Sequence, residues 1–352
     1  MKTGLKKSQL KNVFWAMISA VLAFLTIKVV LDQNKDMSVG ELWKMVKASD
    51  KLFVVLAVIA AAMFVWFEGV AILSILKRSG YKRSHFQGLL YSTSDIYFSA
   101  ITPSATGGQP ASAYFMMRDG IPGGIITATL ILNLAMYTAS IIFLGVVSII
   151  FRPMTFLGFN TFSRVIIVLG FVALLTLATI FIVLLKKENL IFTPAERLIN
   201  FLHKKKIIKN KDAKLKKLEK HKEDYTCCAD LISSSKRVMT AAFIWNLIQR
   251  SSQIMVPVLI YKALGGDAQN MIDVFCKQVL ITIGYNFVPI PGGMGISDYL
   301  MIDGFGELMG SDLSYNVELI SRVISFYMCV LISGLITLAG YFIGRKKDDR
   351  RL

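Results

Sequence analysis

Long uninterrupted apolar runs constrain this chain more than any other feature of its sequence. Six of them approach or exceed the roughly 20 residues that a helix needs to cross a hydrocarbon core about 30 Å thick. They cover residues 13–31, 52–76, 125–150, 165–185, 238–264 and 319–343. Because lipid offers the backbone no hydrogen bonds, each run must form a helix. The sequence therefore predicts an all-α integral membrane protein, a single polytopic domain over residues 1–352.

Two further stretches, residues 86–117 and 274–309, are moderately apolar but are broken in the middle. The first contains Thr-Pro-Ser-Ala-Thr-Gly-Gly-Gln-Pro at 102–110, and the second contains Pro-Ile-Pro-Gly-Gly-Met-Gly at 289–295. Proline removes a backbone donor and glycine weakens a helix. Neither stretch is therefore predicted to be one straight span.

Charge predicts how the broken stretches lie in the membrane. Basic tracts occupy the N-terminus, residues 77–85, the loop 186–237 and the tail 345–351, and loops of this kind stay in the cytoplasm. The stretch 86–117 must then begin and end inside, whereas 274–309 must begin and end outside. We therefore expect two re-entrant hairpins that insert from opposite faces, with both termini in the cytoplasm.

An internal repeat supports this topology. Both hairpins contain the spacing GG-x-x-x-S-x-Y-x-M, which starts at Gly107 in the first and at Gly292 in the second. Related sequence with opposite insertion indicates an inverted-topology repeat, the alternative being a chance match among common residue types. Helices starting after each Gly-Gly pair would aim unpaired N–H groups at the bilayer midplane, which favours an anion such as phosphate. The alternative is that these glycines only permit a tight turn.

Ionisable residues at membrane depth are costly, which makes each a functional candidate. A headgroup that carries both phosphate and amine needs cations and carboxylates around it. The arginines assigned to phosphate are Arg118, Arg250 and Arg322, and the acids assigned to the amine are Glu68, Asp95 and Asp298. The other candidates flank these charges or form the hairpin breaks: Thr106, Gly107, Gly108, Gln109, Asn246, Pro291, Gly292, Gly293 and Gly295. The alternative is that the charges pair with one another, for example Glu68 with Arg250, and only hold the bundle together.

Several other classes of function are disfavoured. The formal net charge of +17 comes from loops beside apolar spans, which is the positive-inside pattern, so we expect no nucleic-acid partner. The cysteines lack metal-ligand spacing, and the phosphate-binding loop of nucleotide hydrolases is absent from the sequence. All histidines, namely His85, His203 and His221, fall in cytoplasmic tracts. We therefore expect no enzyme activity, metal or cofactor.

The string Pro-x-Pro-Gly-Gly-x-Gly-x-x-acid, from Pro289 to Asp298, resembles a known family. Together with residues 103–110 it is similar to the transmembrane domain of the lysylphosphatidylglycerol synthase/flippase family, of MprF type, and its YbhN-like relatives. The resemblance covers nearly the whole chain. The family's acid is often Glu, for which Asp298 is a shorter substitute. The motif residues carried over by resemblance are Pro289, Pro291, Gly292, Gly293, Gly295 and Asp298, with Gly107, Gly108 and Pro110 in the first hairpin.

The resemblance implies a phospholipid flippase of the bacterial cytoplasmic membrane. Its cargo would be lysylphosphatidylglycerol or a similar aminoacylated phospholipid, moved from the inner to the outer leaflet, which protects against cationic antimicrobial peptides. Larger members also carry a soluble aminoacyltransferase domain, which we do not expect in a chain that stops at Leu352. Two alternatives stay open, namely transport of another anionic lipid such as a polyprenyl phosphate, and a non-transporting scaffold for a separate lipid synthase. A homodimer and a separate lipid aminoacyltransferase also stay open as partners.

Overall fold

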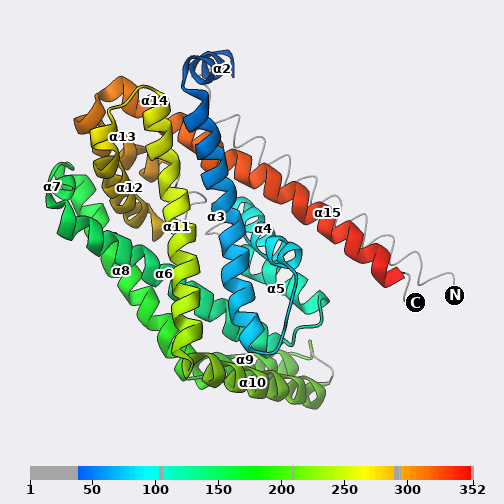
Figure 1. The fold of residues 1–352 in the computed structure, drawn as a ribbon. Helices are drawn as coiled ribbons and strands as arrows, with labels where there is room; N and C mark the ends of the chain where they lie inside the picture. The colour runs from blue at the N-terminus through cyan, green and yellow to red at the C-terminus, as the bar shows by residue number, and fades with distance from the viewer. Residues whose placement is uncertain (1–38, 103–105, 208–209, 289–292, 294, 350–352) are drawn as a thin grey trace.

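The computed structural model describes residues 39–102, 106–207, 210–288, 293 and 295–349 (Figure 1). Within these ranges the chain forms helices and turns and no strand, which confirms the predicted all-α class. The first predicted span, residues 13–31, lies outside the described residues. The helices are α2 (Val39–Ala48), α3 (Lys51–Arg78), α4 (His85–Ile101), α5 (Gly108–Arg118), α6 (Gly123–Phe151), α7 (Pro153–Leu157), α8 (Thr161–Lys186), α9 (Asn189–Lys204), α10 (Lys211–Ser233), α11 (Lys236–Ala263), η2 (Ala268–Asn270), α12 (Met271–Asn286), α13 (Ile296–Met309), α14 (Ser311–Arg322), the π-helical η4 (Val323–Met328) and α15 (Cys329–Asp349).

Four described helices are long and apolar enough to cross a membrane. They are α3, α6, α8 and the continuous helix Ser311–Gly344, which α14, η4 and α15 build together. They coincide with four of the predicted runs and confirm a multi-pass membrane protein. The run 238–264 also forms one helix, α11, of 28 residues. It is not among the four because polar side chains from Asn246 to Gln253 occupy its middle.

Two of the long helices, α3 and α8, begin after residues whose side chains satisfy a free amide of the first turn. The Asp50 carboxylate accepts a hydrogen bond from the Leu52 amide at 2.9 Å ahead of α3, and Asn160 accepts from the Ser163 amide at 2.8 Å ahead of α8. Such N-caps typically contribute about 1 kcal/mol. At Gly310 a φ of 78° separates α13 from α14, a conformation that favours glycine.

The helices α3 and α11 lie side by side at the centre of the bundle and run antiparallel (Figure 1). Their opposite ends meet where the Asp50 amide donates to the Ala263 carbonyl at 2.8 Å. Each is followed by a broken helix pair, α4 with α5 and α12 with α13. The helix α6, which follows the first pair, packs on α12 of the second pair. In the same way α15, which follows the second pair, packs on α4 of the first. This reciprocal packing is the arrangement that an inverted repeat produces.

The two copies of the repeated spacing occupy matching environments. In both halves the serine and the methionine are buried, and the tyrosine between them is exposed. The values are 0% and 3% for Ser112 and Ser297, 0% and 7% for Met116 and Met301, and 46% and 40% for Tyr114 and Tyr299. Equivalent burial at equivalent positions favours a true repeat over a chance match.

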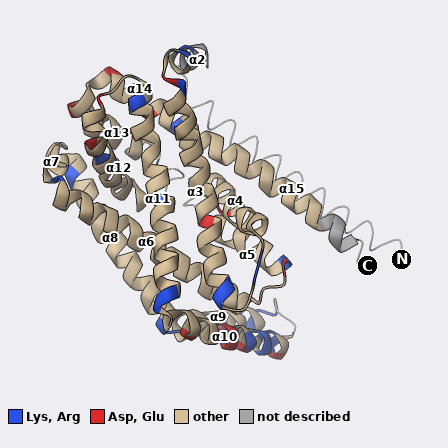
Figure 2. Cartoon of the chain, viewed as in Figure 1, with Lys and Arg blue, Asp and Glu red and all other residues tan. Residues whose placement is uncertain are grey.

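The predicted basic loop 186–237 forms the helices α9 and α10, which lie across one end of the bundle, opposite α2 (Figure 1). Lysine and arginine gather at this end (Figure 2). The Tyr225 hydroxyl of α10 donates to the Leu184 carbonyl at 2.9 Å, and an added side chain at Gly124 of α6 would meet the α10 backbone. Burial raises the pKa of Tyr225 to about 12, so this hydroxyl stays protonated at neutral pH.

Close packing of α3 on α4 depends on Gly69. A Cβ built on Gly69 would lie 2.6 Å from the Gly88 carbonyl group, so the helices would have to move apart. We expect Gly69→Ala to lower the free energy of unfolding in detergent by about 1–3 kcal/mol. Gly306→Ala is the matched control, because no heavy atom lies within 4 Å of a Cβ there. Equal unfolding curves for the two variants would contradict this explanation.

Candidate functional site

Buried polar side chains gather where α3, α4, α5 and α11 meet. Glu68, Asp95 and Arg250 are only 8%, 6% and 6% exposed, and Gln249 is 1% exposed. Burying charged groups away from water is costly unless partners compensate for the lost hydration. We call the set the central cluster; its members are Glu68, Asp95, Gln109, Gln249, Arg250 and Gln253.

The two acids of the central cluster are held by amides. Gln249 donates to Glu68 Oε2 at 3.3 Å, and Gln109 donates to Asp95 Oδ2 at 2.6 Å. The Ser99 hydroxyl also donates to Asp95, at 3.1 Å. Glu68 and Asp95 also lie close enough to interact electrostatically with each other and with Arg250.

Arg250 is held by aromatic rings and an amide. Its guanidinium lies 3.5 Å from the centre of the Tyr137 ring and 5.3 Å from that of Phe64, and it donates to Gln253. No ion pair to Arg250 within 4.0 Å occurs among the described residues, so the pair considered with Glu68 is not formed. A buried cation without a carboxylate partner retains the capacity to bind an anion.

A second group, the Arg322 cluster, lies where α13 meets α14 and consists of Ser297, Asp298, Glu318 and Arg322. The arginine forms ion pairs with Asp298 and, at 2.9 Å, with Glu318, and it donates to the Ser297 hydroxyl at 2.8 Å. The Arg322 side chain is 13% exposed and that of Glu318 7%. With two acids around one arginine, the cluster carries excess negative charge when both acids are ionised.

A small cavity connects the two groups. It measures about 120 Å³, and its lining consists of Gln253, Pro257, Gln278, Tyr285, Ser297, Met301, Ser321, Arg322, Ser325 and Phe326. Gln253 lines this cavity and is also a member of the central cluster, where it accepts a hydrogen bond from Arg250. Two buried lining atoms, Gln278 Oε1 and Ser321 Oγ, have no hydrogen-bond partner among the residues that the structure describes. Because an unpaired buried polar atom costs about 1–3 kcal/mol, these atoms favour a polar occupant.

The helix ends at the two breaks both face carboxylates. At the start of α5 the missing side chain of Gly108 leaves room for Asp95 and Ser99, and the Gly107 amide donates to the Thr102 hydroxyl at 2.9 Å. At the start of α13 the Asp298 carboxylate accepts from the Gly295 amide at 2.9 Å. The positive ends of the helix dipoles thus stabilise acids of the site. An incoming phosphate would meet arginines and carboxylates rather than bare amides.

Comparison with known proteins gives the family of the chain. Residues 13–333 match the family described as "Lysylphosphatidylglycerol synthase TM region". The chain belongs to this family. It is also similar to a UPF0104 membrane protein of Archaeoglobus fulgidus, at 25% identity over 305 residues, which cover 83% of this chain and 88% of that protein. The match confirms the resemblance seen in the Pro289–Asp298 string and supports a membrane lipid-related role.

Some predicted site residues of this family member lie apart from both clusters. Arg118 stands at the far end of α5, over the Phe115 ring at 4.8 Å and next to Gly344 of α15. Ten residues of helix, about 15 Å, separate it from Gly108. Asn246 binds Asn133 at 3.0 Å and so joins α11 to α6.

The glycine-rich breaks are described in part. Thr106 is exposed just before α5, whereas Pro291 and Gly292 lie outside the described residues. Gly293 has a φ of 64°, and a Cβ there would lie 2.6 Å from the Tyr285 ring. Its backbone thus packs against a residue that lines the cavity.

Several site residues of this family member escaped sequence reasoning. Gln253 could have been found, because it follows Arg250 by three residues and so shares its helix face. Gln278 was visible as a polar residue in the first half of the second broken stretch, as was its neighbour Lys277, which belongs to neither cluster. Lys277 is 1% exposed and pairs with Glu307 at 2.7 Å, joining α12 to α13. Tyr137 carried no signal, because an aromatic residue in an apolar run is ordinary.

Proposed function

We propose that this protein is a phospholipid flippase of the bacterial cytoplasmic membrane and not an enzyme. Its cargo is an aminoacylated phospholipid such as lysylphosphatidylglycerol, moved from the inner to the outer leaflet. The observation that carries the proposal is the buried charge of the central cluster, which Gln253 connects to the Arg322 cluster through the core. So many buried ionisable groups are expensive for stability alone.

In the proposed topology α4–α5 and α12–α13 are re-entrant hairpins that insert from opposite faces among the six predicted spans. The antiparallel pair α3 and α11 supports it, as does the exchange of contacts between each hairpin and the helix that follows the other. The basic end with α9 and α10 faces the cytoplasm, because positive loops stay inside. Both termini are then cytoplasmic.

The headgroup is recognised by its two kinds of charge. Arg250, which lacks a carboxylate partner among the described residues, binds the phosphate. The carboxyl pair of Glu68 and Asp95 binds the ammonium groups. Arg322 and Asp298, on α14 and α13, offer a second arginine and a second acid, so the headgroup passes from one cluster to the next while its acyl chains stay in lipid.

The passage requires movement, because the connecting cavity of about 120 Å³ has room for roughly four water molecules and not for a whole headgroup. The hairpins, each of which is broken in its middle, are the elements that move. The driving force is the concentration gradient of the lipid between the leaflets, because the membrane potential, negative inside, opposes outward movement of a lipid of charge +1 by about 2.3 kcal/mol per 100 mV. A separate lipid aminoacyltransferase supplies the cargo, and the transported lipid lowers the negative charge that attracts cationic antimicrobial peptides.

Reconstitution into liposomes tests the function. Acyl-labelled lysylphosphatidylglycerol in the inner leaflet becomes accessible to an impermeant quencher only after it has flipped. We expect the rate of flipping to be well above the rate in protein-free liposomes. Labelled phosphatidylglycerol, which lacks the amine, should flip more slowly than lysylphosphatidylglycerol. Background rates for every lipid would indicate a scaffold, and acceleration of a polyprenyl phosphate alone would assign a different cargo.

A further inference from the structure

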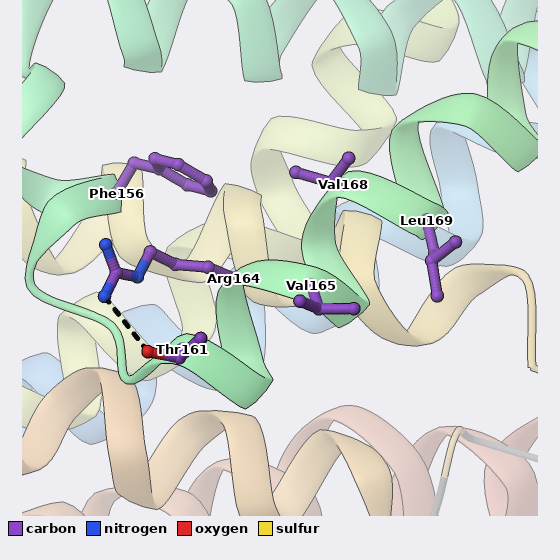
Figure 3. Close-up of a pocket in the computed structure, with 6 residues that line it drawn as sticks. All are labelled: Phe156, Thr161, Arg164, Val165, Val168 and Leu169. Atoms are coloured by element: carbon purple, nitrogen blue, oxygen red, sulfur yellow. Dashed lines mark hydrogen bonds between the residues drawn. The ribbon is translucent and has the colours of Figure 1, made fainter.

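A hollow on the surface of α8 lies far from both clusters along the chain, at the end of the bundle opposite α9 and α10 (Figures 1 and 3). Its volume is about 540 Å³, and its lining consists of Phe156, Thr161, Arg164, Val165, Val168 and Leu169. The three aliphatic side chains are 51%, 49% and 52% exposed, respectively. Their spacing of three and four residues places them on one face of the helix, where they form an apolar stripe.

Arg164 occupies the polar end of this stripe (Figure 3). Its guanidinium donates a long hydrogen bond to the Thr161 hydroxyl at 3.4 Å, and its Nε is buried with no hydrogen-bond partner among the described residues. No carboxylate lies within 4.0 Å of it in the part of the chain that the structure describes.

The position of Arg164 does not stabilise its own helix. It lies one turn after the N-cap Asn160, where the positive end of the dipole disfavours a cation. The guanidinium and the helix end therefore present positive charge in the same place, and the apolar stripe begins there. A positive site at the end of an apolar stripe is complementary to an anionic amphiphile.

We propose that this hollow binds one anionic phospholipid from the leaflet opposite α9 and α10. Its phosphate accepts hydrogen bonds from Arg164 and Thr161, and one acyl chain lies along the stripe of Val165, Val168 and Leu169, with Phe156 on its other side. The site is separate from the proposed transport path and does not depend on the proposed function.

Native mass spectrometry of the delipidated protein in neutral detergent tests the site, with dioleoylphosphatidylglycerol and dioleoylphosphatidylcholine as probes. The wild type should prefer phosphatidylglycerol. Arg164→Gln should weaken phosphatidylglycerol binding by about tenfold and abolish the preference. Val168→Trp, which fills the hollow, should weaken binding of both lipids, and Lys186→Gln at the other end of α8 is the matched control.

Unchanged lipid-free melting temperatures will show that these variants fold. The proposal is overturned if Arg164→Gln keeps the wild-type preference, or if soluble glycerol phosphate competes as well as the phospholipid does. The first result would mean that the cation does not contact the headgroup, and the second that the acyl chain contributes nothing.

Discussion

The Arg250→Gln protein should fold and should flip lipid at least about tenfold more slowly than the wild type in liposomes. The substitution keeps an amide that can bind Gln253 but removes the cation from the Tyr137 ring and from the phosphate path. A charge-assisted hydrogen bond is worth about 1.5–3 kcal/mol, and each 1.4 kcal/mol is tenfold in a binding constant. The measurement is the initial flip rate, normalised to reconstituted protein.

Arg237→Gln is the matched control, because Arg237 lies exposed near the start of the same helix. It should leave the flip rate unchanged. If Arg250→Gln transports lipid at the wild-type rate, Arg250 does not bind the phosphate. If it fails to fold, Arg250→Lys, which keeps the positive charge, should restore folding and part of the transport.

The Arg322→Gln protein should lose about 3 kcal/mol or more of unfolding free energy in detergent. Removing one partner of a buried ion pair leaves an uncompensated charge, at a cost of about 3–5 kcal/mol. Here Glu318 is the group left behind, with a side chain 7% exposed. Chemical unfolding followed by tryptophan fluorescence measures the loss.

Two further variants separate this explanation from a general packing defect. Arg322→Gln combined with Glu318→Gln removes the uncompensated acid and should recover much of the stability. Arg152→Gln breaks the ion pair between Arg152 and Asp273, in which the two charged groups lie 3.6 Å apart. Because the side chains of this pair are 48% and 22% exposed, the substitution should lower the free energy of unfolding by no more than about 1 kcal/mol. An unrescued double variant would contradict the charge explanation.

The sequence was sufficient for the elements that local chemistry determines. Apolar runs predicted the spans at 52–76, 125–150 and 165–185, which α3, α6 and α8 cover. Proline and glycine predicted the breaks that separate α4 from α5 and α12 from α13, because these residues act on the backbone wherever they stand.

The pairing inside the site could not be predicted, because it depends on which helix faces touch. Glu68 accepts a hydrogen bond from Gln249 and forms no ion pair with Arg250. Gln249 and Arg250 are neighbours on α11, so the choice depends on the direction in which each side chain points. Asp95 lies against the N-terminus of α5 because Gly108 has no side chain there. This contact depends on how α4 packs on α5, which the sequence does not show. Residue type therefore predicted which helices carry the site, whereas the hydrogen-bond partners depend on tertiary packing.

The most direct test of the central claim, that the two hairpins insert from opposite faces to share one polar site, is the side on which each hairpin starts. Lys82→Cys, ahead of α4, and Ala268→Cys, ahead of α12, both lie at exposed positions and can be made after replacing the native cysteines with serine. A membrane-impermeant maleimide should label Lys82→Cys only from the cytoplasmic side and Ala268→Cys only from the outside. Labelling of both positions from the same side would contradict the inverted arrangement and, with it, the transport path through the bundle.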